Sequence, residues 1–265
     1  MFLPRSYFSE PGTNRLNAAG DLAAARAHFV KHRPRNLVRL LEQRYDWMNG
    51  YIADDAAVVE IGAGPGLVPF FVRADNLVLS DVIKHPWIDI EADALDLPFE
   101  TGSYDAVICS NVIHHVARPV PFMRDLHRVL KPGGVVLIQE NYTSWMMRLL
   151  LYTLRYEGWS YEVDVFDESA VVNDPNDPWS ANCAVSRLLF DDRARFEAAV
   201  PGFIIERDMM TEFLLAFLSG GTTATWSVPQ LPGSLLTLVQ GIDRALVALA
   251  PRFFAFGRSV ALRKV

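Results

Sequence analysis

The stretch Val58-Val59-Glu60-Ile61-Gly62-Ala63-Gly64-Pro65-Gly66 decides the fold class of this chain. An apolar strand runs directly into an acidic residue, and three glycines follow at alternate positions. Glycine adopts positive φ easily and has no Cβ, so such a turn lets the backbone approach a ligand at the mouth of a parallel sheet. A dinucleotide-binding loop has its third glycine three residues after the second, but Leu67 stands there. The spacing therefore favours a different nucleoside-containing ligand.

Further segments continue the pattern of a strand followed by an acidic or turn-forming residue. An apolar run from Leu77 ends at Asp81, and Asp93-Ala94 follows a third short strand that we expect from Trp87 to Glu91. The next segments are a turn at Leu97-Pro98-Phe99 and a fourth strand from Tyr104 to Asn111. The last segment is Arg128-Val129-Leu130-Lys131-Pro132-Gly133-Gly134. Its Pro-Gly-Gly predicts a turn before a strand from Val135 to Ile138.

This series resembles the class I S-adenosylmethionine (SAM) methyltransferases, and most closely the type 11 group that includes the ubiquinone and menaquinone methyltransferases. The resemblance covers roughly residues 56–140. It implies SAM as cofactor and S-adenosylhomocysteine as product. The site residues that it implies are Gly62, Ala63 and Gly64 under the methionine end, Glu60 at the amino group, Asp81 at the ribose, Asp93 and Ala94 at the adenine, and Ser110 and Asn111 beneath the sulfonium. Taken alone, each acid would be read as a helix cap or a solvated turn residue.

Alternating strands and helices imply an α/β fold with right-handed crossovers. We expect a Rossmann-like, mostly parallel seven-stranded sheet with a sixth strand at Phe203 to Glu206 and an antiparallel last strand at Ser259 to Arg263. A helical cap over residues 1–50 would precede a single SAM-binding domain over 51–265. Two helical insertions are expected after strands five and six, at about 141–200 and 208–257.

Two helical segments show apolar spacing. Residues 14–50 read as helical, a segment that we expect to pack on the domain or to cover the site as a lid; its stripe is Leu37, Leu40, Leu41, Tyr45 and Met48. The helix before the fifth strand follows Pro119 and Pro121, and its stripe is Phe122, Met123, Leu126, Val129 and Leu130.

The two insertions are the candidates for an acceptor pocket. The first contains six aromatic residues that serve either as core or as substrate walls: Tyr142, Trp145, Tyr152, Tyr156, Trp159 and Tyr161. The second is apolar over 231–257, so we expect peripheral membrane contact or a homodimer through this segment unless it packs inside its own domain. Basic residues that would meet anionic head groups are Arg252, Arg258, Arg263 and Lys264.

Composition limits the class of protein. The chain has 265 residues and a net charge of −6, which argues against a nucleic-acid partner. No apolar run of about 18 residues or basic, apolar leader is present, so we expect a cytoplasmic protein, peripheral to the membrane if the apolar insertion meets lipid. Cys109 and Cys183 are too far apart in sequence to suggest a disulfide framework, and we expect buried thiols.

His114 and His115 are the candidate catalytic residues, because a hydroxyl acceptor needs a base and both follow the fourth strand. Backbone hydrogen bonding is their alternative role, and Glu140 and Asp174 are reserve bases. We expect no metal, since adjacent side chains point apart and no companion ligands are evident. The expected function is methyl transfer to a small-molecule or lipid-linked acceptor, oxygen favoured. The alternatives are sugar or natural-product methylation, and a SAM-binding module without catalysis.

Overall fold

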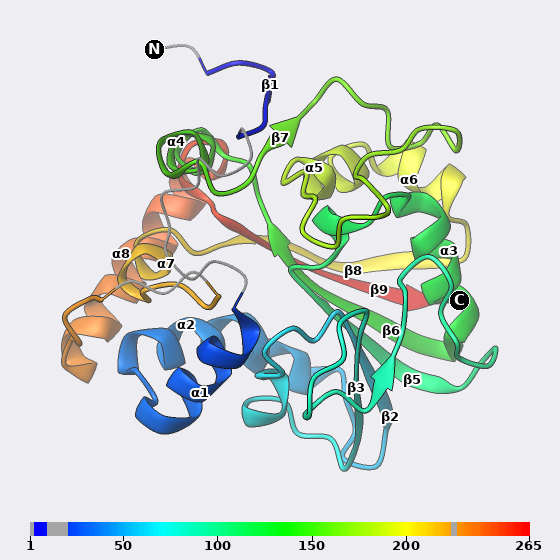
Figure 1. Cartoon of the computed structure of the whole chain (residues 1–265), viewed down its shortest axis with the longest axis horizontal. Helices are drawn as coiled ribbons and strands as arrows, with labels where there is room; N and C mark the ends of the chain where they lie inside the picture. The colour runs from blue at the N-terminus through cyan, green and yellow to red at the C-terminus, as the bar shows by residue number, and fades with distance from the viewer. Residues whose placement is uncertain (1–2, 10–20, 224–226) are drawn as a thin grey trace.

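The computed structural model describes residues 3–9, 21–223 and 227–265. Its centre is a seven-stranded sheet in the order β4-β3-β2-β5-β6-β9-β8 (Figure 1). The strands are β2 (Ala57–Ile61), β3 (Asn76–Asp81), β4 (Ile90–Glu91), β5 (Tyr104–Ser110), β6 (Leu130–Asn141), β8 (Phe203–Thr211) and β9 (Gly257–Lys264). β9 runs antiparallel to both neighbours, and the other pairs are parallel. The expected Rossmann-like sheet is confirmed, and its order reverses beside β2, where such sheets bind ligands.

Helices cover both faces of the sheet. They are α1 (Leu22–His32), α2 (Arg35–Tyr45), α3 (Pro119–Val129), α4 (Trp145–Leu154), α5 (Val185–Phe190), α6 (Arg193–Ala199), α7 (Leu214–Leu218), α8 (Gly233–Leu249) and α9 (Pro251–Phe254). Alternate strand residues point to opposite faces, so Val58 packs with α1 and α2 while Val59 packs with α3, α5 and α6. Figure 1 shows these two helical layers.

The N-terminal helical segment is interrupted once. α1 ends at His32, Arg33 adopts the left-handed conformation with φ 42°, and Pro34 precedes α2. Proline restricts the residue before it and cannot donate a backbone hydrogen bond, so the helical segment is divided into two helices here. Residues 14–20 lie outside the described part of the chain. The apolar stripe on α2 and on the following 3₁₀ helix η1 (Asp46–Gly50) is buried as predicted.

Two strand predictions need correction. Trp87 is not in a strand: the amide of Ile88 donates to the carbonyl of His85 at 3.0 Å, which closes a turn, and only Ile90–Glu91 pairs with β3. The Pro-Gly-Gly segment does not precede the fifth strand but interrupts it. Leu130 pairs with Tyr104 and the next paired residue is Val135, opposite Ala106, so residues 131–134 bulge out of β6.

Figure 1 shows the insertions on two sides of the molecule: α4, α7 and α8 lie at the left, and α5 and α6 lie at the upper right beside α3. The first contains α4, α5, α6 and β7 (Trp159–Ser160), and β7 pairs with β1 (Ser6–Tyr7) in a small sheet that the sequence did not predict. The sixth strand is longer than expected and continues to Thr211, after which α7, α8 and α9 follow. Residues 224–226 of the second insertion lie outside the described ranges.

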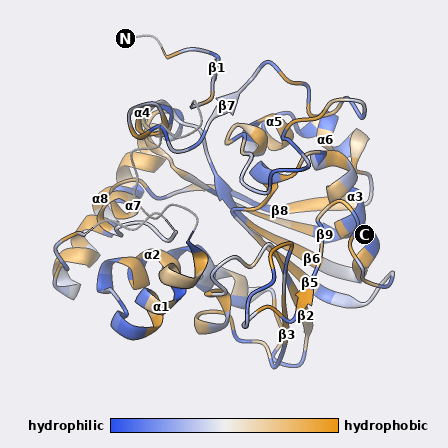
Figure 2. Cartoon of the chain, in the orientation of Figure 1, coloured by the Kyte–Doolittle hydropathy of each residue, from blue (hydrophilic) through white to orange (hydrophobic). Residues whose placement is uncertain are grey.

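Helix α8 buries little of its apolar surface. Only Leu236, Asp243 and Val247 are buried in it, while Leu238 is 59% exposed and Leu249 82%. Figure 2 shows hydrophobic residues along α8 as well as along the sheet strands. In the described parts of the chain, no helix combines the length and apolar character needed to cross a membrane.

The expectation that Arg258 meets lipid head groups is wrong. Its side chain is 2% exposed and forms ion pairs with Asp208 and Asp191, each at 2.7 Å. Arg263 pairs with Glu206 in the same way, at 2.6 Å. Arg258 and Arg263 therefore bind acidic residues of their own fold. Of the four basic residues expected to meet lipid head groups, Arg252 is the exposed one.

Candidate functional site

The glycine loop lies between β2 and the short 3₁₀ helix η2 (Val68–Phe70). Gly62, Gly64 and Gly66 all have positive φ, at 67°, 52° and 61°. A Cβ on Gly62 would come within 2.4 Å of Val112, so glycine is needed there for packing. A Cβ on Gly64 would meet only Leu22, at 3.8 Å, and would otherwise point into open space beside the loop. This is the space that a ligand can fill.

Glu60 and Asp81 stand at the ends of adjacent parallel strands. Glu60 is 2% exposed, and its Oε2 atom is buried without a hydrogen-bond partner. Burial, and then the charge of Asp81, raise the pKa of Glu60 well above 4.5. Asp81 accepts hydrogen bonds from the amides of Gly64, at 2.8 Å, and Ile83, at 2.9 Å. A ligand with an ammonium group fits here, because it would satisfy the orphan oxygen and offset the buried charge.

The other sequence-predicted cofactor residues surround the same cavity. Asp93 is exposed and accepts from the amide of Leu95, and Ala94 lies beside it. Ser110 Oγ lies 3.0 Å from the hydroxyl of Tyr45, which brings α2 to the site. Asn111 has φ 52°, a conformation that is uncommon for a residue other than glycine and that often marks functional sites. The structure thus brings the predicted set together around one space.

Helix α1 clamps the glycine loop from outside. Arg26 donates to the carbonyls of Pro65, at 2.8 Å, and Gly66, and its guanidinium lies 5.0 Å from the ring of Trp87. The indole N–H of Trp87 donates to the carbonyl of Gly64 at 2.9 Å. The loop carbonyls are therefore engaged by protein groups, and α1 holds the loop in its curved shape.

The cavity has a volume of about 380 Å³ and extends from the glycine loop to the insertions. The cofactor side is polar, whereas α4 and α7 supply an apolar wall that includes Met147, Leu151 and Phe217. Tyr156 is the one aromatic residue of the first insertion's predicted set that lines it; Trp159 is fully buried in the core. The sequence did not single out Glu157, Asn141 or Phe217 as site residues. Glu157 lies in an irregular segment, Phe217 lies in an ordinary apolar run, and Asn141 is the last residue of β6, which extends beyond its predicted end at Ile138.

His114 is held by a buried carboxylate. It lies in the 3₁₀ helix η3 (Ile113–His115), and its Nδ1 atom is 2.5 Å from Oε1 of Glu140 at the end of β6. Burial alone would lower the pKa of His114, but the charge of Glu140 and their hydrogen bond, with the charge of Glu157, raise it above 6.5. Burial alone would raise the pKa of Glu140, but His114 and the amide of Asn141 hold it below 4.5.

His115 is placed differently from His114. Its Nδ1 atom is 3.1 Å from the carbonyl of Ser180, so the ring is tied to the loop that follows Asp174. Burial and the charge of His114 lower the pKa of His115. Both histidines and Asp174 line the cavity, but only His114 has a carboxylate partner that fixes its ring.

Comparisons with known proteins show which part of this chain resembles a known family. Residues 59–138 match the family model described as "Methyltransferase domain". A highly reducing polyketide synthase of Aspergillus carbonarius is 29% identical over 131 residues, 48% of this chain and 5% of that protein. The squalestatin tetraketide synthase of Phoma sp. is 39% identical over 92 residues, 34% of this chain and 4% of that protein. The match therefore spans only a small part of these synthases.

Among solved structures, a SAM dependent methyltransferase from Archaeoglobus fulgidus has the same fold. Its TM-score is 0.50 at 14% identity, over 90% of this chain and 99% of that chain. The family match runs from Val59, in the strand before the glycine loop, to Ile138 in β6 and so contains most of the motifs described above. Residues 59–138, less than a third of the chain, are therefore similar to methyltransferase domains, and the chain has the fold of a SAM dependent methyltransferase.

Proposed function

We propose that this protein transfers the methyl group of SAM to a small, largely apolar acceptor bound between the glycine loop and helices α4 and α7. One observation carries the proposal: the cavity lined by Glu60 and the glycine loop is also lined by Met147, Leu151 and Phe217. Donor and acceptor would therefore meet in a single space. In-line methyl transfer needs such an approach, to about 3 to 3.5 Å between the reacting atoms.

SAM supplies a methyl group already activated on a sulfonium, so the protein's task is to bind and orient. In this proposal Glu60 binds the ammonium group, Asp81 the ribose hydroxyls and Asp93 the adenine amine. The remaining cofactor contacts come from Gly62, Ala63, Gly64, Ala94, Ser110 and Asn111. The orphan oxygen of Glu60 and the open space at Gly64 support this placement.

His114 is the proposed base. Because Glu140 binds Nδ1, the neutral ring carries its proton there, and the lone pair of Nε2 accepts a hydrogen bond from the side-chain amide of Asn141 at 3.3 Å, a contact that an acceptor hydroxyl would replace. A hydroxyl acceptor would lose its proton to Nε2 as its oxygen gains the methyl group. Glu140 acts through the ring as a positioning residue, which fixes the tautomer and stabilises the imidazolium. His115 is the second candidate, and its link to Ser180 favours a structural role.

A carbon acceptor is the second candidate function. The matched relatives are named as polyketide and tetraketide synthases, which favours an acceptor carbon beside a carbonyl group. Such a carbon must also lose a proton, and the amide of Asn141 beside Nε2 is suited to donate to the resulting enolate oxygen. Deuterium exchange separates the two cases. Enzyme-dependent exchange at the acceptor carbon in D₂O, with S-adenosylhomocysteine in place of SAM, is expected only for carbon methylation.

Two variants and an acceptor screen test the main proposal. Gly64→Val should block SAM binding, because a β-branched residue resists φ near 52° and would fill the open space at the loop. Asp81→Ala should weaken binding through loss of the ribose acceptor. Calorimetry measures both, and unchanged affinity in folded variants would contradict the cofactor placement. Mass spectrometry of acceptor mixtures then seeks the gain of one methyl group; SAM binding without any acceptor would favour a non-catalytic module.

We also propose that the exposed apolar face of α8 contacts a lipid surface. Its support is the exposure of Leu238, Ile242 and Leu249, with Arg244 and Arg252 exposed nearby. The rival is a homodimer through the same face. A lipid-linked acceptor would then enter the cavity from the membrane side.

A further inference from the structure

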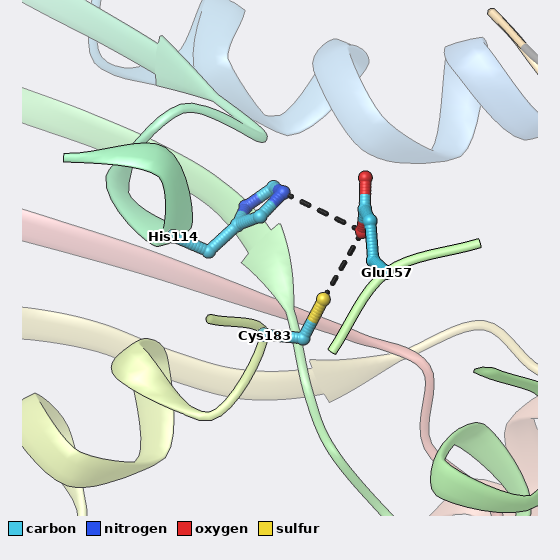
Figure 3. Close-up of side chains that lie close together, drawn as sticks. All are labelled: His114, Glu157 and Cys183. Carbon is cyan, nitrogen blue, oxygen red and sulfur yellow. Dashed lines mark hydrogen bonds and ion pairs between the residues drawn. The ribbon is translucent and has the colours of Figure 1, made fainter. Parts of the chain in front are cut away.

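The first insertion brings two more metal-ligand side chains to His114. Glu157 lies 3.8 Å from Nε2 of His114, measured from its Oε2 atom, and the same oxygen is 3.1 Å from Sγ of Cys183 (Figure 3). The three ligand atoms all lie within 4.8 Å of one another. The expectation of no metal was based on the lack of companion ligands near His114 in the sequence, but the fold supplies two from segments 43 and 69 residues further along the chain.

These distances suit a tetrahedral ion. Bonds of about 2.0–2.2 Å from nitrogen and oxygen and about 2.3 Å from sulfur separate neighbouring ligands by roughly 3.3 to 3.8 Å. The Glu157 contacts of 3.1 and 3.8 Å are already close to this range. The ligand nitrogen of His114 and Sγ of Cys183 are at most 4.8 Å apart. Zinc binding would bring these two atoms about 1 Å closer, which rotation of the two side chains can supply.

The backbone holds the ligands in place. Gly158 and Asn182 form an isolated parallel bridge, and the amide of Cys183 donates to the carbonyl of Gly158 at 3.0 Å. Glu157 and Cys183 are therefore fixed next to each other although 26 residues separate them. On the other side, Glu140 binds Nδ1 of His114, the arrangement in which a carboxylate orients a metal-binding imidazole.

The ligand types select the metal. A thiolate, an imidazole and a carboxylate favour Zn²⁺ over Mg²⁺ or Ca²⁺, which prefer oxygen ligands. His114 and Glu157 line the cavity, while Cys183 lies behind them and is fully buried. Three protein ligands with a fourth position towards the cavity form an open zinc site, with an entry path through the cavity. A neutral imidazole and two anionic ligands also balance the charge of the ion.

We propose that His114, Glu157 and Cys183 bind one Zn²⁺ ion at the base of the cavity. Binding displaces the thiol proton of Cys183 to solvent, and zinc accepts electron pairs from sulfur, from the Glu157 carboxylate and from Nε2. The Nε2 lone pair is the one that the proposed methyl transfer requires, so bound Zn²⁺ blocks that transfer. The binding itself does not depend on the proposed function, because it needs neither SAM nor an acceptor.

The test uses the full chain, stripped with a chelator and then titrated with Zn²⁺ or Co²⁺ without SAM. We expect one ion per chain, and Co²⁺ should show sulfur-to-cobalt charge-transfer absorption with the strong visible bands of tetrahedral cobalt. Cys183→Ala should abolish the charge-transfer band. It should also weaken Zn²⁺ binding by more than the roughly 10- to 100-fold that loss of an outer-shell partner costs. Cys109→Ala, at the other buried cysteine, is the matched control and should bind as the parent does.

Glu157→Gln is a second test in case the cysteine variant does not fold. The Glu157 side chain is 14% exposed, and glutamine keeps its shape. It should weaken Zn²⁺ binding while thermal unfolding without metal stays unchanged. Absence of stoichiometric binding in the parent, or equal Zn²⁺ affinity in the Cys183 and Cys109 variants, overturns the proposal. Stoichiometric binding in a parent that, once stripped of metal, methylates no acceptor would overturn only the proposed function.

Discussion

Replacing Glu60 by glutamine should weaken SAM binding and stabilise the ligand-free protein. Glu60 is buried, its Oε2 atom lacks a partner, and its pKa is raised well above 4.5 by burial and by Asp81. A hydrogen bond from a ligand ammonium to this carboxylate is worth roughly 1.5 to 3 kcal/mol, which corresponds to about 10- to 150-fold in Kd. Glutamine keeps the shape but not the charge. SAM and S-adenosylhomocysteine carry the same ammonium group, so both should lose affinity by this factor.

The stability effect of the Glu60 change should depend on pH. Because the folded pKa is raised, the folded protein keeps a proton that the unfolded chain releases above pH 4.5, and Glu60 lowers stability as pH rises through this window. Glutamine removes that penalty. The advantage of Glu60→Gln in unfolding free energy should therefore be absent well below pH 4.5 and grow above it.

Calorimetry with both ligands and thermal unfolding of the free protein across pH measure these two effects. Glu91→Gln, at the exposed end of β4, is the matched control and should change neither. Unchanged SAM affinity in a folded Glu60 variant would refute the ammonium contact. A loss of stability at neutral pH would show that the carboxylate has a stabilising partner in the free protein, against the reasoning from its orphan oxygen.

Three further predictions concern the base, a buried ion pair and helix α8. His114→Ala should lower turnover by roughly 100- to 10,000-fold with SAM affinity unchanged, and His115→Ala by less than about tenfold. Asp208→Asn removes one of the two carboxylates of buried Arg258, so urea unfolding should show a loss of about 3 kcal/mol. Arg258 and Arg193 hold the pKa of Asp208 below 3.8 against the effect of burial, so the parent should lose this stabilisation as pH falls through that lowered pKa. Leu238→Glu should reduce flotation with anionic liposomes.

Each of these has a clear contrary result. Full turnover in both histidine variants from pH 6 to 9 would remove the histidines from the mechanism. Parent-like urea stability of Asp208→Asn would mean that Asp191 alone satisfies Arg258. Stable dimers that do not bind liposomes would contradict the lipid proposal. If Leu238→Glu also dissociates these dimers in sedimentation analysis, the exposed face of α8 binds a second copy of the chain.

The cofactor side of the site follows from local sequence. Glu60, Asp81 and Asn111 each lie within one residue of the end of a buried parallel strand, and such ends meet at one edge of the sheet. An apolar strand pattern that ends in an acidic residue or a glycine therefore predicts that this residue lies at the carboxyl edge of the sheet, without knowledge of distant contacts. Pro34 carried the signal for the helix break, and alternation along β9 places Arg258 on the same face as the buried Val260.

The acceptor side could not be predicted in this way. Glu157 and Cys183 reach His114 through an isolated bridge in a segment with little regular structure, where no periodicity specifies which residues meet. The pairing of His114 with Glu140 needs the register between β5 and β6 and the turn of η3. Such contacts depend on tertiary packing, which short sequence patterns do not encode.

The grip of Arg26 on the glycine loop links helix α1 to the cofactor thermodynamically. If docking of α1 through the Pro65 and Gly66 carbonyls favours the loop shape that binds SAM, then bound SAM must favour docking of α1 by the same factor. A helix that buries only Leu22, Ala25 and Phe29 gains little from packing alone. Docking of α1 on the glycine loop and binding of SAM are therefore coupled. A higher concentration of SAM also raises the fraction of molecules in which α1 is docked.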